Sequence, residues 1–161
     1  MTHTLTQDEA EAIRAYLGPL VTGEACAPIV RQIPVPLLDH VWPHVCDWIA
    51  ERVVARSKGR FSLQGIAGKL LRGEWQLWVV WDGAYRAVLA TELSAEGVAR
   101  INFATGRGAD DWAHLIGDIE QWAKEQGAHC LEMLARKGWA RHMKSYRVSH
   151  VLLEKDLRDG Q

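Results

Sequence analysis

The sequence has few cysteines and no paired cysteine motif. Cys26, Cys46 and Cys130 are its three cysteines, and no CxxC pair occurs among them. An odd and widely spaced set argues against a disulfide framework and against a zinc ribbon. We therefore expect a reducing, cytoplasmic environment.

Long apolar runs and an excess of positive charge are also lacking. No stretch approaches the roughly 20 apolar residues that span a bilayer, and the beginning, "MTHTLTQDEAEAI", is too acidic and polar for a secretory signal. The formal net charge is -1, whereas proteins that bind phosphate backbones carry a basic excess. We expect neither a membrane nor a nucleic-acid partner.

Several catalytic and ligand motifs are missing. There is no GxSxG elbow, no HExxH pair and no GxxxxGK[ST] loop, and Gly106-x-Gly108 lacks the third glycine of a dinucleotide fingerprint. His40 and His44 are four residues apart, but Pro43 lies between them and a third ligand is not evident. We expect no metal site.

What remains is the composition of one globular α/β domain rich in tryptophan. The chain has 161 residues, 48% of them hydrophobic, and eight tryptophans, enough to bury a core without disulfides or metals. In "WQLWVVW", residues 75–81, both alternating faces are apolar, which predicts a strand covered on both sides. The alternative is a substrate or partner groove lined by Trp75 or Trp78.

The pattern predicts a mixed sheet preceded by a helical extension. Thr6 caps a helix that Gly18-Pro19 ends, so residues 1–28 form the extension and 29–161 the domain. Asp82-Gly83 predicts a hairpin within an antiparallel meander, and the helix that follows predicts a parallel crossover. The predicted elements of the domain are a strand at 29–35, a helix that starts or kinks near Pro43 and runs to about 56, a helix at 62–73, strands at 75–82, 84–94 and 97–106, a helix at 110–127, a strand at 129–135, a short helix at 136–145 and a last strand at 146–157.

This order, over residues 29–157, resembles the GNAT fold of acetyl-CoA-dependent N-acetyltransferases. The end of the chain also resembles a family of small tailed-phage proteins with a GNAT-like fold, through Gly138-Trp139, Tyr146-Arg147 and "HVLLEKDL". The resemblance implies an α/β fold, acetyl-CoA as cofactor and an amine acceptor. It also implies a phage or prophage source, and a virion-associated location if the protein is structural.

The resemblance places the cofactor at the turn that follows the third meander strand. In the family, one strand splays from its neighbour, and backbone N–H groups at the next helix N-terminus bind the pyrophosphate, as such groups bind anions generally. Phe103 stands where the family's spacing has Gln or Arg, and Asp110 and Asp111 place negative charge at the helix start, so the motif is degenerate. The residues implied in cofactor binding are Phe103, Ala104, Gly106, Arg107, Gly108 and Ala109.

The resemblance also implies a proton donor near the last strand. In many members a tyrosine there protonates the departing thiolate, which points to Tyr146, with His142 as the alternative. Glu92, on a predicted central strand, is a candidate general base, and His150 is another.

Two functions from different classes fit these residues. The first is an acyl-CoA-dependent N-acetyltransferase. The second is a non-catalytic GNAT-like virion or host-interaction protein that binds a protein partner, as the degenerate turn and the phage-like ending suggest.

Overall fold

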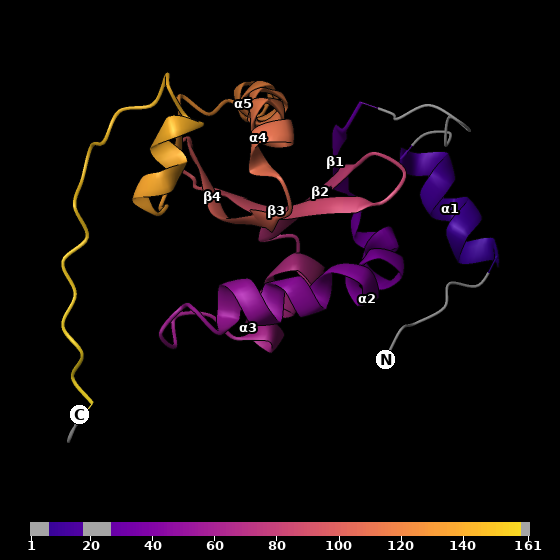
Figure 1. Ribbon diagram of the computed structural model, residues 1–161, viewed down its shortest axis with the longest axis horizontal. Helices are drawn as coiled ribbons and strands as arrows, with labels where there is room; N and C mark the ends of the chain where they lie inside the picture. Colours follow the sequence, from indigo (N-terminus) through magenta and orange to yellow (C-terminus); the bar gives the residue numbers. More distant parts are fainter. Residues whose placement is uncertain (1–6, 18–26, 159–161) are drawn as a thin grey trace.

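The computed structural model describes residues 7–17 and 27–158 and contains one five-stranded mixed sheet (Figure 1). The strand order is β1-β2-β3-β4-β5. Neighbouring strands from β1 through β4 pair antiparallel, and β5 pairs parallel to β4. The predicted meander and the parallel crossover are confirmed. The strands are β1 (Ile29–Ile33), β2 (Trp75–Trp81), β3 (Tyr85–Leu93), β4 (Val98–Gly106) and β5 (Cys130–Met133).

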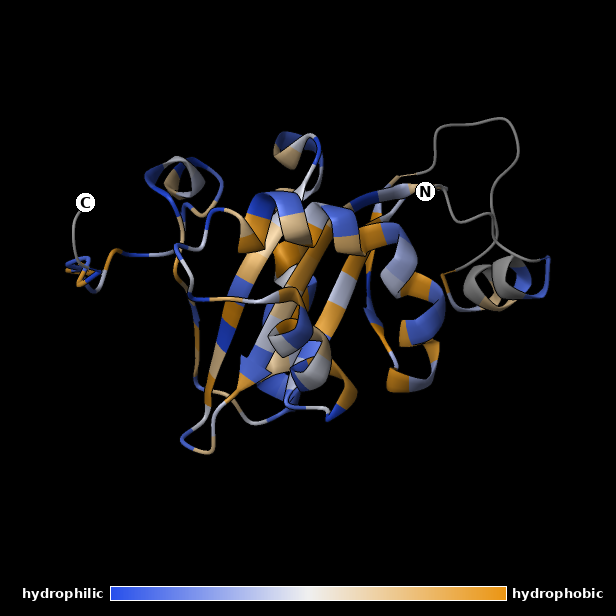
Figure 2. Cartoon of the chain, turned by 90° about the horizontal axis from the view of Figure 1, so that it is seen from below, coloured by the Kyte–Doolittle hydropathy of each residue, from blue (hydrophilic) through white to orange (hydrophobic). Residues whose placement is uncertain are grey.

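Helices cover both faces of this sheet, so the fold is the expected α/β class. On one face lie α2 (Leu38–Ile49) and α3 (Leu63–Leu71), and on the other lie α4 (Ala109–Trp112) and α5 (Ile116–Glu125) (Figure 1). Alternate side chains of the strands feed the two core clusters: Leu77 and Val79 of β2 pack on the α2 side, whereas Trp78 and Val80 pack on the α5 side. Figure 2 shows hydrophobic stretches along these strands, with hydrophilic residues between them, and such stretches are typical of strands buried on both faces.

The helix α2, which was predicted to start or kink near Pro43, begins at Leu38. A 3-10 turn, η1 (Val35–Leu37), leads directly into α2, and Pro43 lies inside the helix rather than at its start. Pro36 supplies the fixed φ of a helix start, so of the two alternatives left open at Pro43, a start is wrong and a position inside the helix is what the structure shows. After Ile49 the chain continues as one π-helical segment, η2 (Ala50–Val54).

The helix predicted at 110–127 is interrupted. It divides into α4, the 3-10 turn η3 (Ala113–Leu115) and α5. Trp112, at φ -132° and ψ -10°, leaves the helical region, and its indole Nε1 donates to the carbonyl of Arg107 at 3.0 Å. The buried ring is thus tied back to the preceding turn at the point where the helix breaks.

The strand predicted at 146–157 is wrong. Between η4 (Lys137–Arg141) and residue 158, where the described part of the chain ends, no strand pairing is formed, and residues 147–158 run as an extended segment outside the body (Figures 1 and 2). Its sequence has strand composition, but a strand forms only where a neighbour accepts its backbone hydrogen bonds. We call residues 147–158 the tail.

The helix α1 (Gln7–Leu17) packs against the domain through its last residues. Leu17 is 2% exposed and belongs to the core cluster on the α2 side, and the Tyr16 hydroxyl donates to the carbonyl of Gln32 next to it on β1. The predicted cap at Thr6 and the stop at Gly18-Pro19 lie outside the described residues. The division at residue 28 stays a prediction.

Candidate functional site

The second half of β4 has a free edge. The parallel pairing with β5 begins at Val98 and ends where Ile101 lies opposite Met133, whereas β4 continues to Gly106 with β3 alone. The register with β3 shifts at this point, because Ala90 pairs with Phe103 and the next β3 residue pairs with Ile101. Asn102 is therefore the extra residue of a β-bulge, and β4 leaves β5 where the bulge redirects it.

The bulge leaves a polar side chain in a buried place without a partner. The Nδ2 atom of Asn102 is inaccessible to solvent and has no hydrogen-bond partner among the described residues. An unsatisfied buried donor costs free energy, of the order of 1–3 kcal/mol. Because the atom is inaccessible to solvent, the groups that cover it have to move before the carbonyl oxygen of a ligand can accept from it.

The turn after β4 contains two glycines with different surroundings. A side chain at Gly106 would place its Cβ 2.3 Å from the carbonyl oxygen of Arg86 and 2.4 Å from the Cβ of Ala87, both on β3. Gly106 therefore serves the close approach of β3, and the space beside it is not open to a ligand. Gly108 has φ 62° and ψ 55° at the N-cap of α4, the left-handed conformation that glycine adopts at least cost.

The backbone N–H groups of this turn are partly used. The N–H of Arg107 donates to the Arg86 carbonyl at 2.9 Å, and the N–H of Asp111 donates to the Gly108 carbonyl at 2.8 Å. The N–H groups between them belong to the first helical turn, where no preceding intrahelical acceptor exists. Those of Gly108, Ala109 and Asp110 are the ones that a phosphate could engage.

Two guanidinium groups lie on the α2 side of the turn. Nη1 of Arg52, in η2, donates to the carbonyl of Gly106 at 2.7 Å. The Arg107 guanidinium lies over the ring of Trp48 in α2, 6.0 Å from its centroid. Arginine pairs well with phosphate oxygens, so these side chains add positive charge beside the N–H groups.

Side chains that follow β5 pack against the other side of the turn. Trp139 lies 5.7 Å from Trp112, centroid to centroid, and Met143 is 8% exposed in the core cluster that contains Ile101 and Trp112. Nδ1 of His142 lies 3.4 Å from a carboxylate oxygen of Asp110. A ligand along the free edge of β4 has to share this space with Trp139 and Met143.

Tyr146 lies on the same side of the sheet but faces α5. Its hydroxyl donates to Glu120 at 2.7 Å. Burial raises the pKa of the Tyr146 phenol well above its ordinary value, and the hydrogen bond to the Glu120 carboxylate raises this pKa further. The phenol therefore keeps its proton at neutral pH.

Glu92 lies apart from Tyr146 and His142. Its carboxylate accepts from Nε1 of Trp75 at 3.2 Å, and Trp75 packs on the α2 side, whereas Tyr146 packs on the α5 side. Glu92 lies opposite Arg100 in the β3–β4 register. Arg100 is six residues before Gly106 on β4, so Glu92 lies about 20 Å from the turn, measured along the strand. Of the residues predicted for the site, Gly106, Arg107, Gly108, Ala109 and His142 lie at or beside one turn. Phe103 is buried in the core on the α2 side, and Glu92 lies elsewhere.

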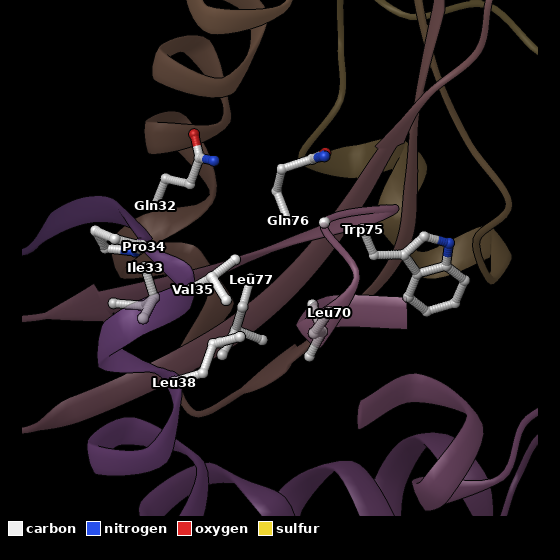
Figure 3. A pocket seen from close by; sticks show the side chains of 10 residues that line it. Gln32, Ile33, Pro34, Val35, Leu38, Leu70, Trp75, Gln76 and Leu77 are labelled. Carbon is white, nitrogen blue, oxygen red and sulfur yellow. The ribbon is translucent and has the colours of Figure 1, made fainter. Parts of the chain in front are cut away.

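Two hollows in the described chain lie away from the turn. One of about 350 Å³ contains Glu92, Glu96 and Glu132, with Arg100 as its cation. The other, of about 140 Å³, lies between the end of β1, the start of β2 and α3 (Figure 3). Its lining is mostly apolar, and its volume is below the roughly 300 Å³ at which ligand pockets begin.

This chain is similar to solved structures in its fold. A soil-metagenome aminoglycoside acetyltransferase, solved with sisomicin, is 14% identical over 82% of this chain and 97% of its own, with a TM-score of 0.58. A Trypanosoma brucei acetyltransferase is 16% identical over 81% and 99%, also at 0.58. A predicted acetyltransferase from Clostridium acetobutylicum, solved with acetyl-CoA, is 14% identical over 81% and 96%, at 0.56. The chain has a GNAT-like fold.

Sequence comparisons add nothing to this likeness. No family model matches the chain, and no curated protein matches it. The described residues also contain no group of three or more His, Cys, Asp or Glu side chains placed to hold a metal ion. Within the same described ranges, no helix is both long and apolar enough to cross a bilayer.

The sequence located the turn after β4 in this GNAT-like chain, but it did not indicate Arg52 and Asn102, two residues outside the turn that belong to the candidate site. Arg52 is 54 positions from the Gly106 carbonyl that it contacts, so only the fold brings it there. Asn102 gave no signal because a bulge depends on the register between strands. The basic residues that run from Arg52 to Arg60 after α2 are the one feature that could have drawn attention to Arg52.

Proposed function

We propose that this GNAT-like chain is an N-acyltransferase that takes its acyl group from acetyl-CoA. The observation that carries the proposal is the free edge of β4, which begins at the bulged, unsatisfied Asn102 and ends at a turn flanked by Arg52 and Arg107. The structural likeness to acetyltransferases supports it.

Binding follows from the groups present along this edge. The N–H groups of Gly108 and Ala109 hold the pyrophosphate, because N–H groups at a helix start bind anions. Arg52 and Arg107 neutralise phosphate charge. The Asn102 amide donates to a carbonyl of the acyl-bearing arm, which satisfies the buried donor.

Bound acetyl-CoA supplies an acetyl group activated as a thioester. Amide formation releases one proton from the amine and requires one at the leaving sulfur, so the chain has to provide an acceptor and a donor. Tyr146 is the proposed donor by its place after β5, and its hydroxyl, which donates to Glu120, has to turn from Glu120 to the sulfur; His142 is the alternative. Glu92 lies on the α2 side of the sheet, away from Tyr146. It is proposed to take the proton of an amine bound in the hollow that Glu96 and Glu132 also line, and that amine then has to move to the thioester.

That hollow favours a cationic acceptor. It combines three glutamates with one arginine, and a negative excess attracts protonated amines. One compared structure holds sisomicin, which supports testing polyamines and aminoglycosides first.

The test is isothermal titration of acetyl-CoA and free coenzyme A. We expect binding that Arg52→Gln and Arg107→Gln each weaken about tenfold, the loss expected for one charge-assisted hydrogen bond of about 1.4 kcal/mol. Asn102→Leu should weaken acetyl-CoA binding as well. Arg72→Gln is the matched control, because Arg72 is an exposed arginine paired with Glu74 at the end of α3. Absence of binding at millimolar concentration, or an equal loss in Arg72→Gln, would contradict the proposal.

A second candidate is a non-catalytic GNAT-like protein, encoded by a phage or prophage, that binds a protein partner. It is supported by Gly106, which is committed to β3, by the Trp139 and Met143 side chains at the turn, and by the negative charge of Asp110 and Asp111. If this candidate holds, the natural chain will not bind acetyl-CoA. An Asp110→Asn, Asp111→Asn variant would then show whether charge alone closes the site.

A further inference from the structure

The strand β1 is an edge of the sheet that a further strand could extend. Among the described strands, β1 pairs only with β2. Val30 is buried in the core cluster on the α5 side and Ile33 in the cluster on the α2 side, so β1 is apolar on both faces. An apolar edge strand is a template for pairing with another chain unless something blocks it.

The backbone carbonyls of Val30, Gln32 and Pro34 lie on the side of β1 that faces away from β2. Carbonyls along an extended chain point alternately to its two sides, and Pro34, directly after β1, is still extended at φ -60° and ψ 146°. The carbonyls of Val30 and Gln32 accept from side chains, whereas the ladder with β2 uses the carbonyls between them. We call this side the outer edge of β1.

Each carbonyl of the outer edge already has a donor. The carbonyl of Val30 accepts from Nη1 of Arg31 at 3.1 Å, that of Gln32 from the Tyr16 hydroxyl, and that of Pro34 from the N–H of Leu37 at 2.9 Å. Pro34 itself has no N–H to offer a neighbour. An incoming strand would leave its own N–H groups opposite these carbonyls without acceptors, which costs free energy. The outer edge is therefore closed to a further strand.

Of these three donors, Tyr16 is the one that comes from another part of the chain. Arg31 lies in β1 and Leu37 in the turn η1 that follows it, whereas Tyr16 lies near the end of α1. The neighbouring Leu17 is 2% exposed, which holds α1 at the β1 end of the sheet (Figure 1). Tyr16 is 37% exposed, so its hydroxyl can exchange the Gln32 carbonyl for water while Leu17 stays in the core.

We propose that α1 is a cap that keeps the outer edge of β1 from pairing with another strand, so that the chain stays monomeric while Tyr16 is bound to Gln32. The strand that the cap excludes is β1 of a second copy, because two equal edges align antiparallel with Val30 opposite Gln32. Such a two-fold pair uses the same residues on both chains. It also places Arg31 opposite Arg31, and like charges in that position repel. The proposal does not depend on acetyl-CoA binding.

Light scattering after gel filtration tests the cap. The natural chain should have the monomer mass at micromolar concentration. The double variant Tyr16→Phe, Arg31→Thr removes both side-chain donors and the repelling charge, and its mass should rise to that of a dimer or more as the concentration increases. Arg86→Thr is the control, because Arg86 is an exposed arginine on β3, which has a strand on each side. A dimeric natural chain would overturn the proposal, and so would a double variant that stays monomeric with the near-ultraviolet circular dichroism of the parent.

Disulfide trapping locates the contact and needs no stable dimer. With the three natural cysteines replaced by serine, Arg31→Cys places one thiol at the centre of the outer edge. Two such positions face each other in the proposed pair at a Cα separation of about 4.5 Å, which a disulfide can span. Adding Tyr16→Phe should speed formation of the reducible dimer band about tenfold, the effect of freeing one hydrogen-bonded carbonyl worth about 1.4 kcal/mol. Arg86→Cys measures random collision. Equal rates with and without the Tyr16 hydroxyl, or rates no faster than that of Arg86→Cys, would contradict the proposal.

Discussion

At the scale of single residues, the two glycines of the turn after β4 have separable roles. Gly106→Ala should lower the free energy of unfolding by about 2–3 kcal/mol, because its Cβ would overlap the β3 backbone. Gly108→Ala should cost only about 1 kcal/mol, the price of a left-handed conformation. Urea unfolding of both variants measures the difference. An equal loss would show that β3 can move away from Gly106.

Tyr85 gives a prediction on pH, because its hydroxyl is buried without a hydrogen-bond partner among the described residues. Burial raises the pKa of Tyr85 to about 12 from 10.0. Below the unfolded pKa both states keep the proton, and as the pH rises from there toward the folded pKa only the unfolded state loses it, so stability is lost over this window. Urea unfolding between about pH 9 and pH 11 should therefore show a steeper decline for the natural chain than for Tyr85→Phe.

The same variant has a second expected effect. At neutral pH, Tyr85→Phe removes an unpaired buried hydroxyl while keeping the ring stacked on His44, so stability should stay equal or rise by about 1 kcal/mol. A loss of stability at neutral pH would reveal a partner for this hydroxyl. Parallel pH profiles for the two proteins would show that Tyr85 is ionised as easily in the folded state as in the unfolded one.

At the scale of elements, the break between α4 and α5 ties the candidate site to the core. The indole of Trp112 donates to the Arg107 carbonyl. The indole of Trp122 contacts Trp78 edge to face and donates to no acceptor among the residues that the structure describes. Trp112→Phe should therefore lose about 1 kcal/mol more stability than Trp122→Phe, the worth of one hydrogen bond. Hydrogen exchange in the peptide covering residues 103–112 should rise in the first variant alone. An unchanged exchange rate would mean that the turn holds its shape without Trp112.

Elements whose signals are local could be predicted from the sequence. Asp82-Gly83 predicted the β2–β3 hairpin, and the apolar spacing from Trp112 to Ala123 predicted a helix on the sheet. The tail was predicted as a strand from composition, but strand formation depends on a partner edge that the sequence does not reveal. For the same reason the bulge at Asn102 and the reach of Arg52 to the turn were missed, although the turn itself was located from its glycines.

At the scale of the whole molecule, α1 adds to the stability of the domain from outside the sheet. Leu17 is buried in the same cluster as Leu38 and Val41 of α2, and α1 contacts α2. Loss of a buried leucine side chain removes its transfer free energy and leaves a cavity. Stability that the extension provides should therefore depend on this one side chain.

Leu17→Ala should lower the free energy of unfolding by about 3 kcal/mol, with a single cooperative transition in urea. Glu11→Ala, on an exposed position of the same helix, should change it by less than about 0.5 kcal/mol. If Leu17→Ala instead left the free energy of unfolding unchanged, α1 would not be part of the cooperative core of the domain.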